Sequence, residues 1–298
     1  MNATASVNRF EELLTKNAPY MAGSVRKGRG YSPHWESQFG ETLMRVFGKD
    51  EERMTKAVKG YIRFAMDAVR LQKRFDKDKC YIAKTYAEAA NAVYHNEEYM
   101  HSLYLPGILL SQYLWPHHYN QQQFFLTKFM PLVRQAKQKR FADVGIGTGF
   151  FSRLALTSEP EMTGVGYDIS DHSLSYSQMQ IRSFDLQNRW HCEKRNILTN
   201  PPAEKYPFII SVEVLEHLED PVAFITGLKA MLAPGGYGFI TAAITAPNED
   251  HIYLYNNCEE VKKELCLGGF KVVEFQEDLA YDPKKDEPVP RIGAFIVQ

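Results

Sequence analysis

Three glycines at alternate positions, Gly145, Gly147 and Gly149, follow a short apolar segment that contains Asp143. A stretch with helical character comes directly after them. Glycine lets the backbone turn sharply and approach a ligand without a Cβ in the way. The first turn of a helix presents free N–H groups that bind an anionic group. The pattern therefore predicts a cofactor-binding turn. A dinucleotide fingerprint would need its third glycine at position 150, where Phe150 stands.

Polar side chains also follow the next two predicted strands. Asp168 lies 23 residues after Gly145, about where a ribose-binding carboxylate belongs. Asn196, followed by Ile197, lies at the end of the third predicted strand. These positions predict a site at the ends of adjacent strands, where a nucleoside would bind.

The order of these motifs resembles that of the class I S-adenosylmethionine-dependent methyltransferases. Two further segments, 208–221 and 232–241, resemble the fourth-strand and fifth-strand motifs of that family. The resemblance extends over residues 125–298 and implies S-adenosyl-L-methionine as cofactor. Where Asn196 stands, the family often carries an acidic residue near the adenine amino group, and an asparagine still accepts that bond. The cofactor-binding residues that the resemblance implies are Asp143, Gly145, Gly147, Gly149, Asp168, Asn196, Ile197, Glu213 and Tyr119.

The segment 213–217 offers a second kind of chemistry. Glu213, Glu216 and His217 share one face if the turn after the fourth strand is helical. Carboxylates and an imidazole suit a divalent metal, with His251 as a fourth ligand. Some ubiquinone-pathway and small-RNA 2′-O-methyltransferases that this segment resembles use such residues in this way. The same phrase is common in family members without a metal, so we expect no metal here and place Glu213 near the methionine moiety.

His217 and His251 are the predicted catalytic residues. An imidazole titrates near neutrality and can take a proton from a hydroxyl or ammonium nucleophile. The alternative for His251 is a surface or packed histidine. We expect methyl transfer to a small-molecule acceptor through oxygen, nitrogen or sulfur, in which the protein aligns the nucleophile and excludes water. A thioether acceptor would need no base.

After residue 140, short apolar segments alternate with helical ones. This alternation predicts an α/β fold with a doubly wound, mostly parallel sheet of seven strands, the Rossmann-like methyltransferase fold that the resemblance implies. The linker before the last strand contains no helical segment, so that strand should be antiparallel. The strands are expected at 141–145, 163–168, 190–195, 208–213, 237–244, 270–276 and 292–297, and the helices at 150–157, 172–187, 220–232 and 258–267.

Residues 1–120 are predicted to form a helical cap over a catalytic domain of residues 121–298. Apolar residues recur with helical spacing over 50–75, whereas 22–34 is rich in glycine and is expected to be a mobile loop of the lid. A dimerisation or packing element, including a homodimer contact, is the alternative for this region. The predicted acceptor-binding residues are Tyr31, His34, Tyr104, His117 and His118.

Composition and charge narrow the remaining alternatives. The net charge is −1, and the basic residues of the first half alternate with acidic ones, so nucleic acid is not an expected partner. An RNA methyltransferase that uses this half and a non-catalytic cofactor-binding protein are the alternative functions. No stretch approaches the ~20 apolar residues of a membrane span. The four cysteines form no CxxC pair, which indicates reduced thiols and a cytoplasmic location.

Overall fold

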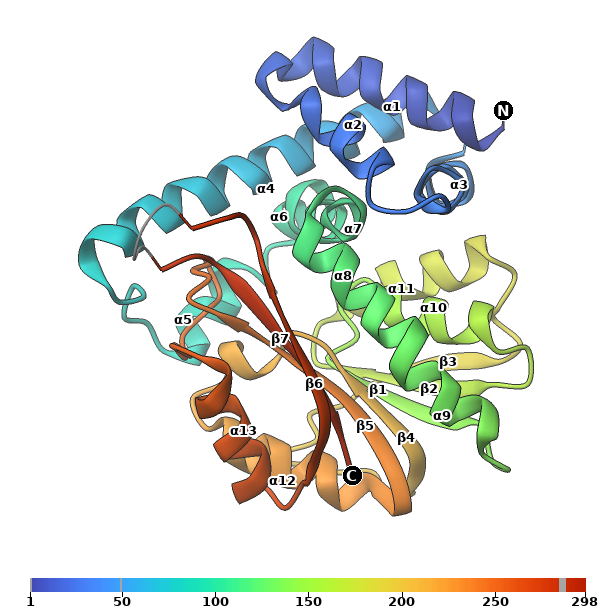
Figure 1. Cartoon of the computed structure of the whole chain (residues 1–298), viewed down its shortest axis with the longest axis vertical. Coiled ribbons are helices and arrows are strands. Elements are labelled where there is room, and N and C mark those ends of the chain that lie inside the picture. Colours follow the sequence, from blue (N-terminus) through green and yellow to red (C-terminus); the bar gives the residue numbers. More distant parts are fainter. Residues whose placement is uncertain (1, 49, 284–287) are drawn as a thin grey trace.

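The computed structural model describes residues 2–48, 50–283 and 288–298. The second half of the chain forms one sheet with helices on both faces, and the first half is helical and lies across one end of that sheet (Figure 1). The predicted α/β class and the N-terminal helical region are confirmed. No helix among the described residues is long and apolar enough to cross a membrane.

The sheet has seven strands in the order β3-β2-β1-β4-β5-β7-β6. All neighbouring pairs are parallel except those that involve β7, which confirms the predicted antiparallel last strand. The chain order reverses between β1 and β4, and ligands of such sheets bind beyond the carboxyl ends of the strands at this point. The strands are β1 (Arg140–Val144), β2 (Thr163–Asp168), β3 (Trp190–Lys194), β4 (Tyr206–Ser211), β5 (Leu232–Ile244), β6 (Val272–Leu279) and β7 (Arg291–Val297).

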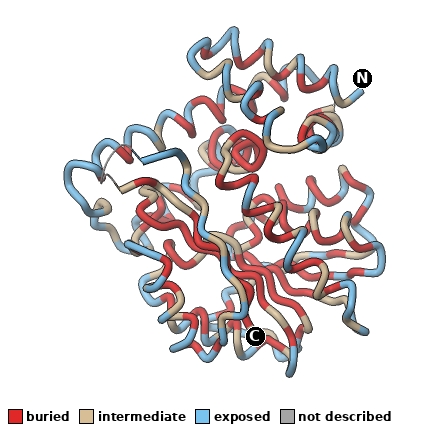
Figure 2. The backbone as a smooth tube through the Cα atoms, in the orientation of Figure 1, coloured by how far each residue is buried: buried red, intermediate tan, exposed pale blue. Residues whose placement is uncertain are grey.

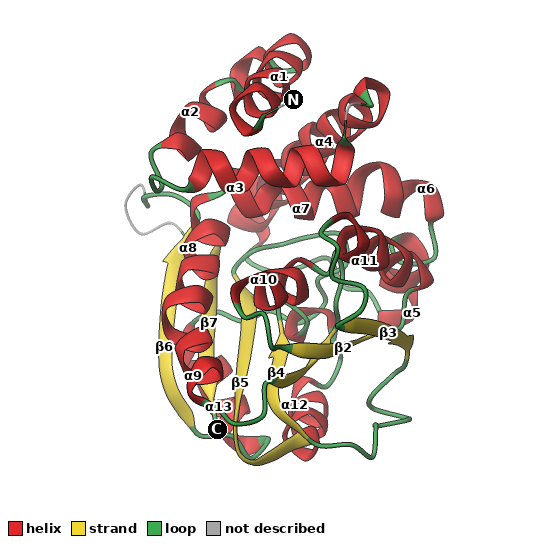
Figure 3. Cartoon of the chain, turned by 90° about the vertical axis from the view of Figure 1, so that its right-hand side faces the viewer, coloured by secondary structure: helices red, strands yellow, loops and turns green. Residues whose placement is uncertain are grey.

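Alternate residues of the central strands enter two hydrophobic cores, one on each face of the sheet. The central strands are buried along most of their length (Figure 2), and helices flank the sheet (Figure 3). In β4, Phe208 and Ile210 belong to one core and Ile209 to the other. Strands covered on both sides are continuous apolar runs, as this one is. The helices of this half are α10 (Phe150–Ser158), α11 (Asp171–Ser183), α12 (Pro221–Met231) and α13 (Cys258–Leu267), with a 3₁₀ turn, η5 (Leu215–His217).

The core on one face continues without a break into the helical region, from Val7 to Ile296. The long helix α4 is capped by Asp50, whose side chain accepts from Arg53 N at 3.0 Å. It buries Met54, Val58 and Ile62 along one stripe. The two halves are thus packed as one body. The helices of the first half are α1 (Ala3–Asn17), α2 (Gly23–Arg29), α3 (Trp35–Thr42), α4 (Glu51–Asp78), α5 (Tyr86–Ala92), α6 (Glu97–Tyr99), α7 (Leu105–Leu114), α8 (Pro116–Phe124) and α9 (Met130–Gln135), with a 3₁₀ turn, η1 (Pro19–Met21).

The loop predicted over 22–34 is wrong, because α2 occupies most of it. Gly28 is buried, and a Cβ on it would lie 2.4 Å from the ring of Trp35. This glycine therefore permits close packing of α2 against α3 and does not provide flexibility. Arg29 forms ion pairs with Glu11 at 2.8 Å and Glu36 at 3.0 Å, which tie the segment to its neighbours.

Three π-helical turns interrupt the helices of the first half: η2 (Leu43–Phe47), η3 (Met100–Tyr104) and η4 (Phe125–Phe129). A π turn holds one residue more than the α turn that it replaces and often lies near a functional site. The turn η3 joins α6 to α7 and ends at Tyr104, which lines the cavity described below.

Candidate active site

A cavity of about 950 Å³ lies at the carboxyl ends of the parallel strands. Its walls come from both halves of the chain. The sheet contributes residues 143–148, 167–169 and 195–198, and the helical region contributes residues from α4, α7 and α8. The position is the one expected of a ligand site in a doubly wound sheet.

The glycine turn after β1 forms one wall of this cavity. Gly145, Gly147 and Gly149 have φ of 75°, 49° and 72°, where L side chains are strained. A Cβ on Gly145 would lie 2.4 Å from Val214, and one on Gly149 would lie 2.7 Å from Ser177. No described atom lies within 4 Å of a Cβ placed on Gly147. Two of the glycines therefore permit packing, and the third leaves open space beside the backbone that a ligand can fill.

Asp168 lies directly beside this turn, at the end of β2. One of its carboxylate oxygens, Oδ2, accepts from Gly147 N at 3.1 Å, and Oδ1 accepts from Ser170 N at 2.9 Å. Burial raises the pKa of Asp168, while these backbone donors oppose the rise. Each oxygen keeps a lone pair, so the carboxylate can still accept from the hydroxyls of a ribose.

The wall of the cavity that follows β2 and β3 is largely apolar. Ile169 and Leu198 line it and are partly exposed, 39% and 45% respectively. Ile197 lines the same wall, and the Asn196 side-chain oxygen accepts from Leu198 N at 2.9 Å. Partly exposed apolar side chains beside a glycine turn suit a flat heterocycle, so the residues present fit an adenosyl cofactor.

Asp143 is almost completely buried in the wall of the cavity. Its Oδ2 accepts from Ser152 Oγ at 2.7 Å, and Ser152 Oγ also accepts from Trp190 Nε1 at 3.0 Å. Burial raises the pKa of Asp143 to about 7. The carboxyl group thus joins the end of β1 to the first turn of α10.

Glu213 follows β4 in a left-handed conformation with φ of 52°. Its N–H donates to Thr241 Oγ1 at 3.0 Å, and its Oε1 accepts from Gln121 Nε2 at 3.3 Å. Burial raises the pKa of Glu213 to about 7. The predicted helical face with Glu216 and His217 does not form, because η5 begins only at Leu215. Glu213 and His217 both line the cavity, and Glu213 lies after β4, before the η5 turn that carries Glu216 and His217.

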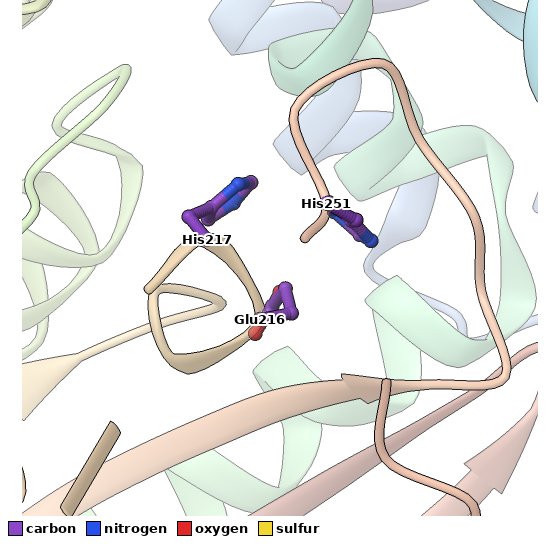
Figure 4. Close-up of side chains that lie close together, drawn as sticks. All are labelled: Glu216, His217 and His251. Atoms are coloured by element: carbon purple, nitrogen blue, oxygen red, sulfur yellow. The ribbon is translucent and has the colours of Figure 1, made fainter. Parts of the chain in front are cut away.

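Glu216, His217 and His251 form a cluster in which one ligand atom of each lies within 4.8 Å of the others. Figure 4 shows the loop with His251 facing the turn that carries Glu216 and His217. Burial raises the pKa of Glu216 well above its usual value, and neither of its oxygens has a hydrogen-bond partner among the described residues. Burial lowers the pKa of His251 to about 3, so this imidazole is neutral. A buried carboxylate between imidazoles fits a divalent cation.

Aromatic rings form the wall of the cavity in the helical region. Phe64 stacks on Trp115 and Trp115 on His117, each with ring centroids 5.6 Å apart. Burial lowers the pKa of His117 to about 3. His118 Nδ1 lies 2.9 Å from Ser111 Oγ. The predicted acceptor residues Tyr104, His117 and His118 all line the cavity, as does Trp115.

The structure places the other predicted residues elsewhere. His34 is exposed, and neither it nor Tyr31, Tyr119 and Gly149 is among the described residues that line the cavity. Tyr31 stacks on Tyr119 with centroids 5.4 Å apart, and the Tyr119 hydroxyl lies 2.6 Å from Ser32 Oγ. The segment 117–119 is helical, so its successive side chains point in different directions and only the first two reach the cavity.

Sequence reasoning missed several residues that shape the site. Asp250 lies beside both histidines, and Tyr94 donates to its carboxylate at 2.9 Å. Gln121 joins Glu213 to Thr241. None of these residues belongs to a motif. The one sequence signal is the high density of tyrosines between residues 81 and 104, which includes Tyr94.

Comparison with known proteins agrees with this geometry. A family model described as a methyltransferase domain matches residues 117–266. A ubiquinone biosynthesis O-methyltransferase of Coxiella burnetii is 30% identical over 139 residues, which cover 47% of this chain and 58% of that protein. One of Actinobacillus pleuropneumoniae is 31% identical over 149 residues, which cover 46% and 59%. The chain thus spans less than two thirds of these curated relatives.

Solved structures share the fold at low sequence identity. Phosphoethanolamine N-methyltransferase 2 of Haemonchus contortus, in complex with S-adenosyl-L-methionine, superposes with a TM-score of 0.54 and 12% identity, covering 72% of this chain and 60% of that one. An O-methyltransferase family protein of Burkholderia thailandensis gives 0.52 and 12%, covering 81% and 71%.

The strand order and the glycine turn define the Rossmann-like fold of the class I methyltransferases. The chain belongs to the methyltransferase domain family, whose members use S-adenosylmethionine as cofactor.

Proposed function

We propose that the protein transfers a methyl group from S-adenosylmethionine to a small-molecule acceptor, for which a hydroxyl group is the best candidate. The observation that carries this proposal is a single cavity that contains both the glycine turn and the His217–His251 pair. The matched relatives are named O-methyltransferases, which supports an oxygen acceptor rather than a nitrogen or sulfur acceptor.

The sheet half supplies the cofactor contacts. Gly147 leaves room for the cofactor, Asp168 accepts from the ribose hydroxyls, and Ile197 lies on the adenine side. Glu213 is a carboxyl group on the same wall, positioned to pair with an ammonium group. Bound S-adenosylmethionine supplies an activated methyl group together with its own leaving group.

The histidine pair accepts the proton that the acceptor hydroxyl loses. The acceptor hydroxyl must lose its proton when its oxygen is methylated, so a group of the chain has to take that proton. We propose that His217 is the base: its ring nitrogen without a hydrogen accepts the hydroxyl proton, and the neutral His251 lies beside it. The two ring centroids are 4.8 Å apart, so both imidazoles can contact one acceptor.

In this proposal the helical region is the cap over the cavity. Its aromatic wall of Phe64, Trp115 and His117 covers the cavity and excludes water from the reacting groups. His117 is neutral, so this wall favours an uncharged acceptor over a phosphate. An RNA acceptor is not favoured, because the catalytic histidines lie inside a cavity with walls from both halves of the chain.

The cluster of Glu216, His217 and His251 also suggests a metal site as a second candidate role. The Glu216 carboxyl group favours this role, because neither of its oxygens has a hydrogen-bond partner among the described residues. Glu216, His217 and His251 would then hold a divalent cation, and that cation would polarise the acceptor oxygen. Dialysis against EDTA followed by an activity assay separates the two roles. If activity disappears and returns with Mg²⁺ or Zn²⁺, the cluster is a metal site; unchanged activity assigns it to proton transfer alone.

Two measurements test the proposed function. Calorimetry with S-adenosylmethionine and S-adenosylhomocysteine should show binding of both, and absence of binding would contradict the proposal. Incubation with methyl-labelled S-adenosylmethionine and a metabolite extract should then give a labelled small molecule, identified by mass spectrometry. Binding without any labelled product would instead indicate a non-catalytic cofactor-binding protein.

The four free cysteines support a cytoplasmic location.

A further inference from the structure

Asp250 is a buried carboxylate that no sequence motif singles out. It lies on the loop after β5, next to His251, and its side chain is 0% exposed. A buried carboxylate costs free energy unless hydrogen-bond donors surround it. The donors around Asp250 come from both halves of the molecule.

Two of these donors belong to the helical region. Tyr94, between α5 and α6, donates to Asp250 Oδ2 at 2.9 Å, and Tyr104, at the end of η3, donates to the same oxygen. The sequence separates Tyr94 and Tyr104 from Asp250 by 156 and 146 residues. The contact therefore exists only when the cap is packed on the sheet half.

His217 contacts Asp250 through the backbone as well as the side chain. Its Nδ1 hydrogen-bonds to the Asp250 backbone oxygen at 3.1 Å and lies 3.4 Å from the carboxylate oxygen Oδ2. Both neighbours are acceptors, so Nδ1 carries a hydrogen and the lone pair of the neutral ring is on Nε2. Asp250 thus determines which nitrogen of His217 is free to react.

The cap also contacts the rest of the loop that Asp250 occupies. Ala246 N donates to the Tyr81 hydroxyl at 3.1 Å, and Lys84 donates to the backbone oxygen of Glu249. The Ala246 oxygen in turn accepts from His251 Nδ1 at 2.6 Å. Residues of the helical region therefore hold the loop at Ala246, Glu249 and Asp250. Backbone oxygens of this loop in turn fix the rings of His217 and His251.

We propose that Asp250 is a positioning residue, held by Tyr94 and Tyr104, that fixes the orientation and tautomer of His217 for methyl transfer. Asp250 is not among the described residues that line the cavity, so it acts through His217. Carboxylates orient histidines in this way both in metal sites and in acid–base catalysis. The role rests on the proposed function only in naming His217 as the group that needs orienting.

The kinetic test uses the acceptor found in the extract experiment. Asp250→Asn should lower kcat about 10- to 100-fold, as loss of such partners usually does, and leave the Kd for S-adenosylmethionine within about twofold. Tyr104→Phe should lower kcat less, and the Asp250→Asn/Tyr104→Phe double variant should be no worse than Asp250→Asn. Tyr99→Phe is the matched control: its ring lies 6.1 Å from that of Tyr104, and no described hydrogen bond joins it to Asp250. Effects of Asp250 and Tyr104 that multiply, or an unchanged kcat in Asp250→Asn, would overturn the proposal.

A second readout needs no acceptor. NMR of the protein labelled with ¹⁵N-histidine should show His217 with hydrogen on Nδ1 in both proteins, because the Asp250 backbone oxygen that accepts it is kept in Asp250→Asn. Asp250→Asn should nevertheless shift the Nδ1 signal, because the carboxylate oxygen 3.4 Å away is replaced by an amide. Hydrogen on Nε2 in the wild type, or an unchanged Nδ1 signal in Asp250→Asn, would overturn the proposal. Thermal unfolding confirms that each variant folds, and Tyr104→Phe replaces Asp250→Asn in the NMR comparison if the latter does not. A wild-type protein that neither binds the cofactor nor methylates anything contradicts the proposed function, while the NMR comparison still decides the role of Asp250.

Discussion

The two halves of the cavity are built in different ways. The half proposed to bind the cofactor, here called the cofactor half, uses backbone groups and strand ends: the Gly147 N–H, the end of β2, and a turn of five residues around three glycines. The half proposed to bind the acceptor is called the acceptor half. The acceptor half uses side chains that are far apart in the sequence, from Phe64 in α4 to His251 after β5. Under the proposed function, the cofactor half would bind the cofactor, which is the same for every acceptor, and the acceptor half would determine which acceptor enters. Substitutions in the two halves should therefore change different measured quantities.

The largest expected effect is in the cofactor half. Gly147→Arg should abolish binding of S-adenosylmethionine, because the new side chain fills the open space beside the turn. Gly235 is the matched control, since its φ is 74° and no described atom lies within 4 Å of a Cβ there. Calorimetry should show normal binding for Gly235→Arg. Detectable binding by a folded Gly147→Arg variant would mean that the cofactor does not lie against this turn.

The acceptor half should respond in turnover. His217→Gln should lower kcat by about 10²- to 10⁴-fold, the usual contribution of a general base, with little change in the Kd for S-adenosylmethionine. His191→Gln, on the exposed edge strand β3, is the control. Single-turnover methyl transfer together with calorimetry separates the two quantities. A variant that loses cofactor affinity and not turnover would break the division between the halves.

A smaller effect is expected for the ribose carboxylate. Asp168→Ala should weaken S-adenosylmethionine binding about 10- to 100-fold, because it removes hydrogen bonds to a charged acceptor. The exposed Asp171, three residues further on, serves as control in Asp171→Ala. The kcat at saturating cofactor should stay close to that of the wild type. A large loss of kcat at saturation would place Asp168 nearer to the reacting groups than this division allows.

The smallest effect concerns stability and pH. Burial raises the pKa of Asp143 from an ordinary 3.8 to about 7. Between these values the folded protein holds a proton that the unfolded chain releases, so this group makes the protein less stable as the pH rises and contributes no further change above about 7. An asparagine side chain at this position does not titrate and would bear no such cost. The unfolding temperature of Asp143→Asn relative to wild type should therefore rise from about pH 5 to about pH 8. A constant difference would show that Asp143 titrates normally.

The same contrast explains what could be predicted from the sequence. The strands, the antiparallel last strand and the wall at Gly147, Asp168 and Ile197 followed from local patterns, because each strand and each residue at a strand end can be recognised within its own short segment. The parallel sheet then brings the strand ends together. The helix at 23–29 was missed because its glycines resemble those of a loop, whereas Gly28 is required by the ring of Trp35.

The acceptor half was only partly predictable. Of the predicted acceptor residues, Tyr104, His117 and His118 line the cavity, whereas Tyr31 does not. Tyr31 stacks on Tyr119, a predicted cofactor residue, in a contact between α8 and the segment before α3. The role of Asp250 depends on two tyrosines about 150 residues away, and no pattern within one segment contains that information.

The π turn Met100–Tyr104 has a consequence for insertions and deletions in evolution. Its extra residue sets the rotation between α7 and the segment that carries Tyr94, because each helical residue turns the chain by about 100°. Deleting one residue here would restore an ordinary α turn and rotate Tyr94 away from the oxygen that it shares with Tyr104. Related sequences that keep both tyrosines should therefore keep the spacing of ten residues between them, even where the residues in between change freely.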